Sequence, residues 1–248
     1  IKTKVEIFAK PFSWPEVPQW SNYVEAWTSA NMSHYFLNSL IQAGATVIVL
    51  AIVSTMAAYV LSRFDFIANK FIQTSFVSAM GVPAIMVVLP LFSIISGMGI
   101  LNNVAAGRTV LIILYVGINV PYTTIFLLTF FSNISRTYEE AAAIDGCPPM
   151  RTFWKIMFPM AQSGIVTVTI FNFINIWNEY FLSLIFASSD KLKPVAPGLY
   201  GMINSMKYTG DWAGMFASVV IVFVPTVVIY AFLSDKIISG VTAGGNKG

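Results

Sequence analysis

The chain has 248 residues, of which 56% are hydrophobic and only 10% charged, and its formal net charge is +3. Soluble domains carry roughly 25% charged residues, and the mean hydropathy here is +0.74. These values exclude an ordinary soluble domain and indicate a membrane protein that lies against lipid and other helices. No nucleic-acid partner is predicted.

Residues 1–36 form the first segment, and they contain no apolar run long enough to cross a bilayer. Three prolines and the tryptophans Trp14, Trp20 and Trp27 lie within residues 10–27. This composition predicts an extended loop followed by a short helix, with the indoles at the headgroup level. We expect this segment to be external and residues 37–248 to form a transmembrane domain.

Five apolar stretches follow, at residues 37–61, 71–96, 109–131, 164–187 and 213–234. About 20 apolar residues suffice to cross a bilayer core as a helix. The sequence therefore predicts an all-α, polytopic helical bundle with five spans. Because residues 1–36 have no anchor of their own and the chain opens on Ile1, we expect a sixth span upstream. A cleaved signal peptide is the alternative.

Loop charges allow either orientation. With residues 137–159 inside, seven Lys and Arg lie inside and four outside, but the three lysines of residues 1–36 make the two sides equal. Charge is therefore permissive under the positive-inside rule.

The polar loop 137–159 reads TYEEAAAIDGCPPMRTFWKIMFP between two apolar stretches. Thr137 followed three residues later by Glu140 is a capping-box pattern, which predicts a helix start. The helix it begins is too short to persist alone in water, so it needs a surface to pack on. Three alanines allow another backbone to approach closely, and Gly146 allows a positive φ that ends the helix.

A second helix is predicted after Pro148 and Pro149, which suit a first helical turn, and we expect Pro159 to stop it. The loop thus reads as a helix–turn–helix at the membrane surface. Such a polar loop in a membrane protein indicates a docking site.

The fourth stretch carries Asn172, Asn175 and Glu179 at positions i, i+3 and i+7, which places them on one helical face. Polar groups inside a bilayer face the bundle interior or water. This face is expected to line a translocation path or a subunit interface, and its amides and carboxylate suit a solute that carries hydroxyl groups. Hydrogen bonding to neighbouring helices, with no solute contact, is the equal alternative.

The chain has one cysteine, Cys147, and one histidine, His34. No thiolate metal site, zinc site or catalytic triad can be assembled from them. The chain also lacks a G-x-x-x-x-G-K-[ST] phosphate loop. Any coupling to ATP must therefore come from a partner.

The pattern EAA-x3-G-x9-I-x-F-P, spelled from Glu140 to Pro159, resembles the EAA loop of ABC-importer permeases. The runs FxNSL at 36–40, AAYVLSRFDF at 57–66, WNEY at 177–180 and SGVTAGGNKG at 239–248 resemble carbohydrate-uptake permeases of the maltose-transporter type, and the ending resembles their smaller, MalG-like subunit. The resemblance implies the type I ABC-importer fold and a multi-pass protein of the bacterial cytoplasmic (inner) membrane.

The resemblance also implies partners: a second, different permease, two ATPase subunits that bind ATP and Mg²⁺, and an external solute-binding protein. No cofactor or catalytic residue is expected in this chain. The motif residues Glu140, Ala141, Ala142 and Gly146 are implied to couple to the ATPase. On physical grounds we expect Glu140 and Asp145 to pair with Arg or Lys of the ATPase and Phe153 or Trp154 to supply apolar packing. A purely structural, capping role of the loop is the alternative. ATP-driven approach of the two ATPases would displace this loop and open the bundle alternately to each side.

Two other classes compete with a permease that imports a sugar or oligosaccharide. A secondary transporter or channel explains the spans and the polar face but leaves the loop without a purpose. An intramembrane enzyme would need a catalytic constellation, which Glu179 alone does not make. The sequence does not name the sugar, and the lysines at 191, 193 and 207 suit either an anionic saccharide or the binding protein.

Overall fold

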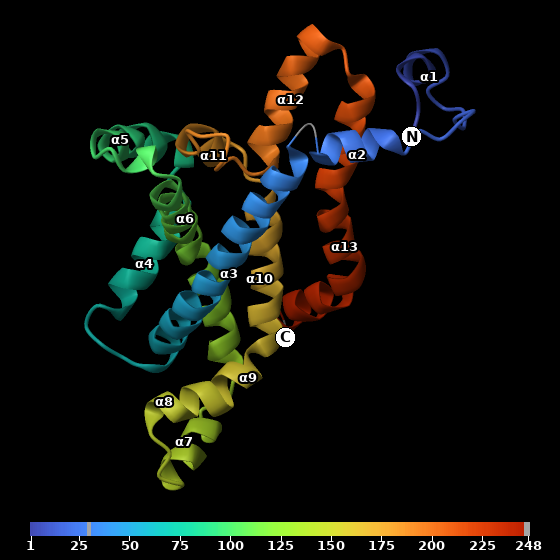
Figure 1. The fold of residues 1–248 in the computed structure, drawn as a ribbon. Helices are drawn as coiled ribbons and strands as arrows, with labels where there is room; N and C mark the ends of the chain where they lie inside the picture. Colours follow the sequence, from blue (N-terminus) through green and yellow to red (C-terminus); the bar gives the residue numbers. More distant parts are fainter. Residues whose placement is uncertain (29–30, 246–248) are drawn as a thin grey trace. The chain divides into compact units, whose positions relative to one another are not determined.

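The computed structural model describes residues 1–28 and 31–245, and it describes their side chains except at 206–209 and 233–245. Every regular element in these ranges is a helix (Figure 1), which confirms the all-α prediction. The elements are α1 (Lys4–Ala9), α2 (Ser21–Thr28), α3 (Met32–Arg63), α4 (Asn69–Met80), α5 (Ala84–Gly97), η1 (Ile100–Asn102), α6 (Val104–Asn133), α7 (Thr137–Ile144), α8 (Pro149–Thr152), η2 (Phe153–Met157), α9 (Phe158–Met160), α10 (Gln162–Trp177), α11 (Phe181–Phe186), α12 (Val195–Thr209) and α13 (Trp212–Gly245).

Three helices are long and apolar enough to cross a membrane: Met32–Arg63, Val104–Asn133 and the Trp212–Phe232 part of α13. They correspond to the first, third and fifth predicted spans. The second predicted span is instead two helices, α4 and α5, bent by 95°. The fourth is also interrupted, because α10 ends at Trp177 and α11 begins at Phe181.

The break in the second span has a local cause. Pro83 has no N–H and disfavours helical geometry at Val82, and Gly81 is a weak helix former. The N–H groups of Gly81 and Val82 donate to carbonyls only three residues back, at 3.1 Å each. Hydropathy summed over residues 71–96 does not detect this turn.

The chain divides into two compact units, and several long helices contribute to both. Unit 1 comprises residues 1–44, 91–112 and 175–231, and unit 2 comprises 45–90, 113–174 and 232–248. The predicted division at residue 36 into an external segment and a permease domain stays a prediction.

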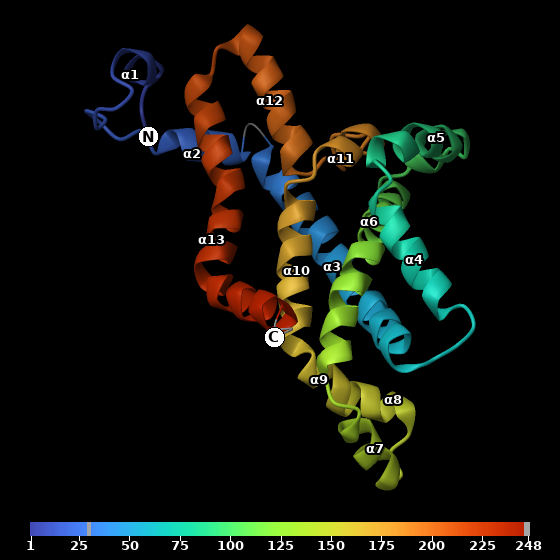
Figure 2. The ribbon, with the colours of Figure 1, turned by 180° about the vertical axis from the view of Figure 1, so that it is seen from behind.

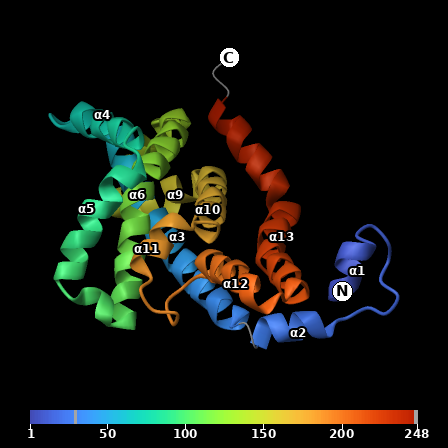
Figure 3. The ribbon, with the colours of Figure 1, turned by 90° about the horizontal axis from the view of Figure 1, so that it is seen from above.

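Unit 1 is organised around Trp177, whose indole is buried. The Nε1–H donates to the carbonyl of Val222 at 3.1 Å, and the ring packs edge-on against Phe36 with centroids 5.1 Å apart. The helices α12 and the first part of α13 form a hairpin (Figures 1 and 3) that turns at Gly210, where φ is +62°. Side chains of Lys207 and of the tail at 239–248 lie outside the described residues.

The start of unit 1 confirms the short helix predicted after the Pro-rich loop, since α2 covers residues 21–28. It also contains α1, which was not predicted and which begins with a capping box between Thr3 and Glu6. Hydrogen bonds from the backbone N–H groups of Glu16 and Thr3 hold the pKa of Glu6 down at about 2. Trp14 and Trp20 are exposed, and their place at the headgroup level stays a prediction.

Unit 2 places the polar loop at one end of its helices. The group α7, α8 and α9 lies beyond the ends of α6 and α10 in both views (Figures 1 and 2). One core cluster joins α3, α6, α10 and the loop, and it contains Ala58, Tyr59, Leu127, Phe131, Phe153, Met157, Ala161, Ile165 and Val168. Gly164 lets α10 approach α6, because a Cβ there would lie 2.6 Å from the ring of Phe130.

Candidate functional site

The first arm of the loop is α7, and it ends in the sharp turn that the sequence predicts. Gly146 has φ +69°. The N–H of Cys147 donates to Ala142 O at 2.8 Å and that of Gly146 donates to Ala143 O at 3.0 Å. These two bonds make a complete Schellman motif, which satisfies the last carbonyls of the helix.

The start of α7 differs from the prediction. The N-cap residue is Arg136, whose backbone is already helical, and no side chain caps the helix. Thr137 therefore lies inside the first turn, where its own N–H is 3.3 Å from Ser135 Oγ. The predicted capping box between Thr137 and Glu140 is wrong, because a capping residue must have extended rather than helical geometry. Glu140 is thus not needed for the cap, and it is exposed.

The second arm comprises α8, η2 and α9. Pro148 and Pro149 open it as predicted, with Pro149 in the first turn. The arm then widens to a π-helical turn, in which the N–H of Phe158 donates to Phe153 O. It ends after Met160 instead of at Pro159, and the chain bends by 73° into α10. Pro159 has no N–H to donate to the helix. A π turn beside it is expected, since π-bulges occur where the regular hydrogen-bond pattern of a helix is disturbed.

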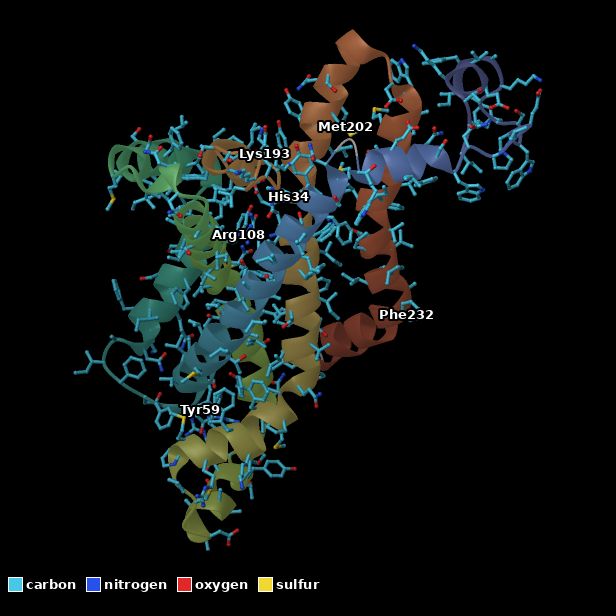
Figure 4. The ribbon with its side chains drawn as sticks, viewed as in Figure 1. His34, Tyr59, Arg108, Lys193, Met202 and Phe232 are labelled. Carbon is cyan, nitrogen blue, oxygen red and sulfur yellow. The ribbon has the colours of Figure 1, made fainter. Side chains whose placement is uncertain are left out.

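Side chains from both arms contact the last turns of α3 (Figure 4). The Tyr59 hydroxyl donates to Glu139 Oε1 at 2.8 Å, and Arg63 Nε lies 3.1 Å from Glu139 Oε2. The other end of the guanidinium donates to Ile134 O at 2.7 Å. The Tyr59 ring also packs against Phe153 of the second arm, with centroids 5.1 Å apart. This contact was not predicted, although an arginine just after the first apolar stretch and a second glutamate beside Glu140 are visible in the sequence.

The seven residues assigned to ATPase coupling do not all reach the surface. Exposed side chains or backbone are found at Glu140, Ala141, Asp145, Gly146 and Trp154. Ala142 is buried, and the Phe153 side chain is only 3% exposed. Phe153 therefore packs the loop against α3, while Trp154, 42% exposed, faces outward.

Three apolar side chains add to the exposed surface of the loop and were not singled out in the sequence. Tyr138, Ile144 and Met150 are all exposed, and Ile144 reaches 87%. Because α7 has only two turns, most of its residues must face water when one side packs on the bundle. The same loop also exposes charged residues, at Glu140, Asp145, Arg151 and Lys155. A mixed surface with aromatic and arginine side chains is typical of protein interfaces.

A cleft of about 290 Å³ lies where the loop meets the end of α3. It is lined by Arg136, Glu140 and Cys147 together with Tyr59 and Arg63. Cys147 is partly accessible there, so the single thiol of this chain lies at the loop surface.

In the fourth span, Asn172 is buried and hydrogen-bonded within unit 2. Its Nδ2 donates to Thr123 Oγ1 of α6 at 2.9 Å, and the Thr123 hydroxyl donates to Asn119 O at 2.7 Å. This hydrogen bond between neighbouring helices is the alternative that the sequence left open beside solute contact. Asn175 lies one turn further on and is exposed.

Glu179 does not share a helical face with the two asparagines, so that prediction is wrong. α10 ends at Trp177, and Glu179 precedes α11. Its carboxylate accepts from the N–H groups of Leu182 at 2.6 Å and Ser183 at 3.1 Å. A carboxylate at a helix start satisfies free N–H groups and complements the helix dipole, which explains the acid without reference to a solute.

A second ordered region lies in unit 1, where residues 191–193 run along α3. Side chains spaced four residues apart on α3 contact three consecutive carbonyls: His34 Nε2 lies 3.1 Å from Lys191 O, Asn38 Nδ2 donates to Lys191 O and Lys193 O at 2.9 and 3.0 Å, and Gln42 Nε2 donates to Leu192 O at 2.9 Å. Arg108 of α6 donates to Asn38 Oδ1 at 2.8 Å (Figure 4). These contacts hold the backbone of residues 191–193 against α3, while Lys191 is exposed.

Among the residues that the structure describes, no three His, Cys, Asp or Glu side chains lie together as metal ligands.

Comparison with known proteins gives a consistent picture. A family model described as "Binding-protein-dependent transport system inner membrane component" matches residues 48–241. The chain is 34% identical to the diacetylchitobiose uptake system permease protein NgcG of Streptomyces coelicolor over 98% of its own length and 79% of that protein. It is 30% identical to the sulfoquinovosyl glycerol transport system permease protein SmoH of Agrobacterium fabrum, over 100% of its length and 85% of the relative.

Among solved structures, the fold resembles a chain in the crystal structure of a bacterial ABC transporter involved in the import of the acidic polysaccharide alginate. The TM-score is 0.76 at 21% identity, and the match covers 90% of this chain and 81% of the other. At this identity the likeness establishes the fold.

Proposed function

This chain belongs to the family of binding-protein-dependent transport system inner membrane components, and we propose that it is the permease subunit of an ATP-driven importer for a sugar or oligosaccharide. It forms half of the translocation path and couples to an ATPase through the loop 137–159. As a member of this family it is a multi-pass inner-membrane protein with apolar helices able to span the bilayer.

The observation that carries the proposal is the rigid, exposed loop at one end of unit 2. Its two arms are locked by the Schellman turn at Gly146 and by contacts to α3, yet Trp154 and Ile144 face water. A short helix ordered in this way and left uncovered is suited to seat in a partner. A secondary transporter has no use for such a surface.

The partners follow from the same reading. The loop faces the cytoplasm and seats in one of two ATPase subunits, which bind ATP and Mg²⁺ and carry out hydrolysis; this chain has no catalytic role. A second, different permease completes the path. The family description itself names dependence on a binding protein, and the ordered loop at 191–193 with its exposed Lys191 is a suitable contact for that protein on the external face.

The substrate class rests on the relatives, whose names describe an uptake system for diacetylchitobiose and a transport system for sulfoquinovosyl glycerol. Both are carbohydrate compounds, which supports a saccharide here. Of the polar residues in the fourth span, Asn175 is the candidate for solute contact because it is exposed. Asn172 and Glu179 shape the path by holding α10 against α6 and by starting α11.

The test is purification of the intact membrane complex in mild detergent, with mass identification of all components. We expect a second permease and an ATPase to accompany the chain. The variant Trp154→Ala should retain the second permease and lose most of the ATPase, whereas Trp14→Ala, a matched change of an exposed tryptophan in the N-terminal segment, should retain both. Recovery of the wild-type chain alone, or as a homo-oligomer without ATPase, would favour a secondary transporter instead.

Cys147 offers a second measurement without mutation, because it is the only cysteine. Its reaction with a soluble maleimide should be slowed several-fold when the ATPase is bound and restored when the ATPase is stripped. A labelling rate that does not respond to the ATPase would contradict docking at this loop.

A further inference from the structure

The contact between the loop and the end of α3 is a largely buried ion pair, although Arg63 Nε makes no hydrogen bond there. The side chain of Arg63 is 5% exposed and that of Glu139 is 19% exposed. Each carboxylate oxygen has its own partner, Tyr59 for Oε1 and Arg63 for Oε2. Arg63 Nη2 also donates a hydrogen bond to the carbonyl of Ile134, which lies between the end of α6 and the start of the loop.

Such an ion pair contributes little net free energy to folding. Removing two charges from water costs about as much as their attraction returns, and an apolar pair of the same volume often serves equally well. What the pair does provide is a defined geometry, because a buried charge left alone is unfavourable and each partner also makes a directional hydrogen bond, Glu139 with the Tyr59 hydroxyl and Arg63 with the carbonyl of Ile134. The arrangement therefore points to a need for a fixed position of α7 on α3.

Tyr59 contacts both arms of the loop and therefore links the positions of the two arms. Its hydroxyl bonds to Glu139 of α7, and its ring packs against Phe153 of η2 and against Phe131 of α6 at 5.6 Å. A displacement of either arm must therefore move the last turns of α3 or break a buried contact. α3 is also a helix that can span the membrane.

We propose that Arg63, Glu139 and Tyr59 form the link through which displacement of the loop by the ATPase is transmitted to α3. This inference rests on the proposed function and adds to it the helix that receives the movement. The three are positioning residues, since they act through the helices they join and touch neither ATP nor solute. Glu139 thus has a different task from its neighbour Glu140, which is exposed to the partner.

The experiment uses the complete transporter in proteoliposomes and compares sugar imported per ATP hydrolysed. Glu139→Gln keeps the size of the side chain and removes its charge. We expect this variant to retain its ATPase and hydrolysis while sugar imported per ATP falls by about tenfold, within the range of coupling between contacting residues. Asp65→Asn makes the same chemical change at an exposed residue beyond the end of α3, and its coupling ratio should equal that of the wild type.

The double variant Arg63→Glu with Glu139→Arg restores an ion pair in reversed order, and it should recover much of the ratio lost in Glu139→Gln. Tyr59→Phe removes a single hydrogen bond and keeps the ring packing, so it should give a smaller loss and serves if the charge variants fail to assemble. A residue needed only for folding would lower hydrolysis and uptake together and leave their ratio unchanged.

An unchanged ratio in both Glu139→Gln and Tyr59→Phe, in a wild-type complex that is itself coupled, overturns the link and leaves the proposed function standing. Absence of any ATPase from the wild-type complex overturns the proposed function, and the link with it.

Discussion

Replacement of Gly146 isolates the contribution of one backbone conformation to coupling. Its φ is +69°, and a Cβ placed there would meet no atom within 4 Å. The penalty for a larger residue is therefore conformational alone. An L-residue in the left-handed region loses about 1–2 kcal/mol, which shifts the equilibrium away from the native turn by a factor of about 5–30.

The same geometry ranks the substitutions. Gly146→Val combines the left-handed penalty with a branched side chain, whereas Asn tolerates this region, so Gly146→Asn should be much milder. We expect Val to remove most of the ATP-dependent uptake and the stimulation of ATP hydrolysis, with the amount of chain in the membrane unchanged. Gly117→Ala is the control, because that glycine lies within α6 and its added Cβ also meets nothing.

Uptake and ATPase stimulation in membrane vesicles, normalised to the chain present, decide the outcome. Equal activities for Val and Asn would show that the positive φ is not what the loop requires. Full uptake with Val would count against coupling through this loop altogether.

Three further predictions concern packing and capping. Gly164→Ala should lower the free energy of unfolding by about 1–3 kcal/mol, because its Cβ would lie 2.6 Å from the Phe130 ring; a melting curve in detergent measures this, and Gly44→Ala, with no atom within 4 Å, should leave the midpoint almost unchanged. Glu179→Gln should cost about 0.5–2 kcal/mol as a weakened helix cap, and a variant with unchanged melting but lost uptake would point instead to solute contact. For Glu6, hydrogen bonds lower the pKa from 4.5 to about 2, so the carboxylate favours the folded N-terminal segment at and above pH 4.5 and that contribution is lost as the pH falls through 2. Relative to Glu6→Gln, the wild-type segment should resist pepsin at pH 4.5 and lose this advantage near pH 2, and equal cleavage at both pH values would refute the capping role.

Several features could be predicted because they depend on residues close together in the chain. The three continuous spans follow from hydropathy summed over about 20 residues, and the turn at Gly146 follows from a glycine after a run of helix formers. The exposed Glu140, Asp145 and Trp154 follow from the polarity of the loop.

Other predictions failed where a local pattern competed with its surroundings. Thr137 and Glu140 match a capping box, yet the backbone arrives from α6 already helical at Arg136, so the box does not form. Glu179 was read as part of a continuous helical face, but its carboxylate is used by the start of α11. In both cases the residues of the pattern are present, but the conformation of a neighbouring segment determines which contacts they make.

By itself, the sequence determined that this is a helical membrane protein with a polar loop able to dock, because apolar transfer and turn geometry act through adjacent residues. Only the tertiary structure decided which loop residues face outward, and it turned Phe153 inward and left Ile144 exposed. It also brought Glu139 to Arg63 and Tyr59, about 80 residues apart in the chain. An ion pair of that separation depends on how three helices pack, and no periodicity in the sequence encodes it.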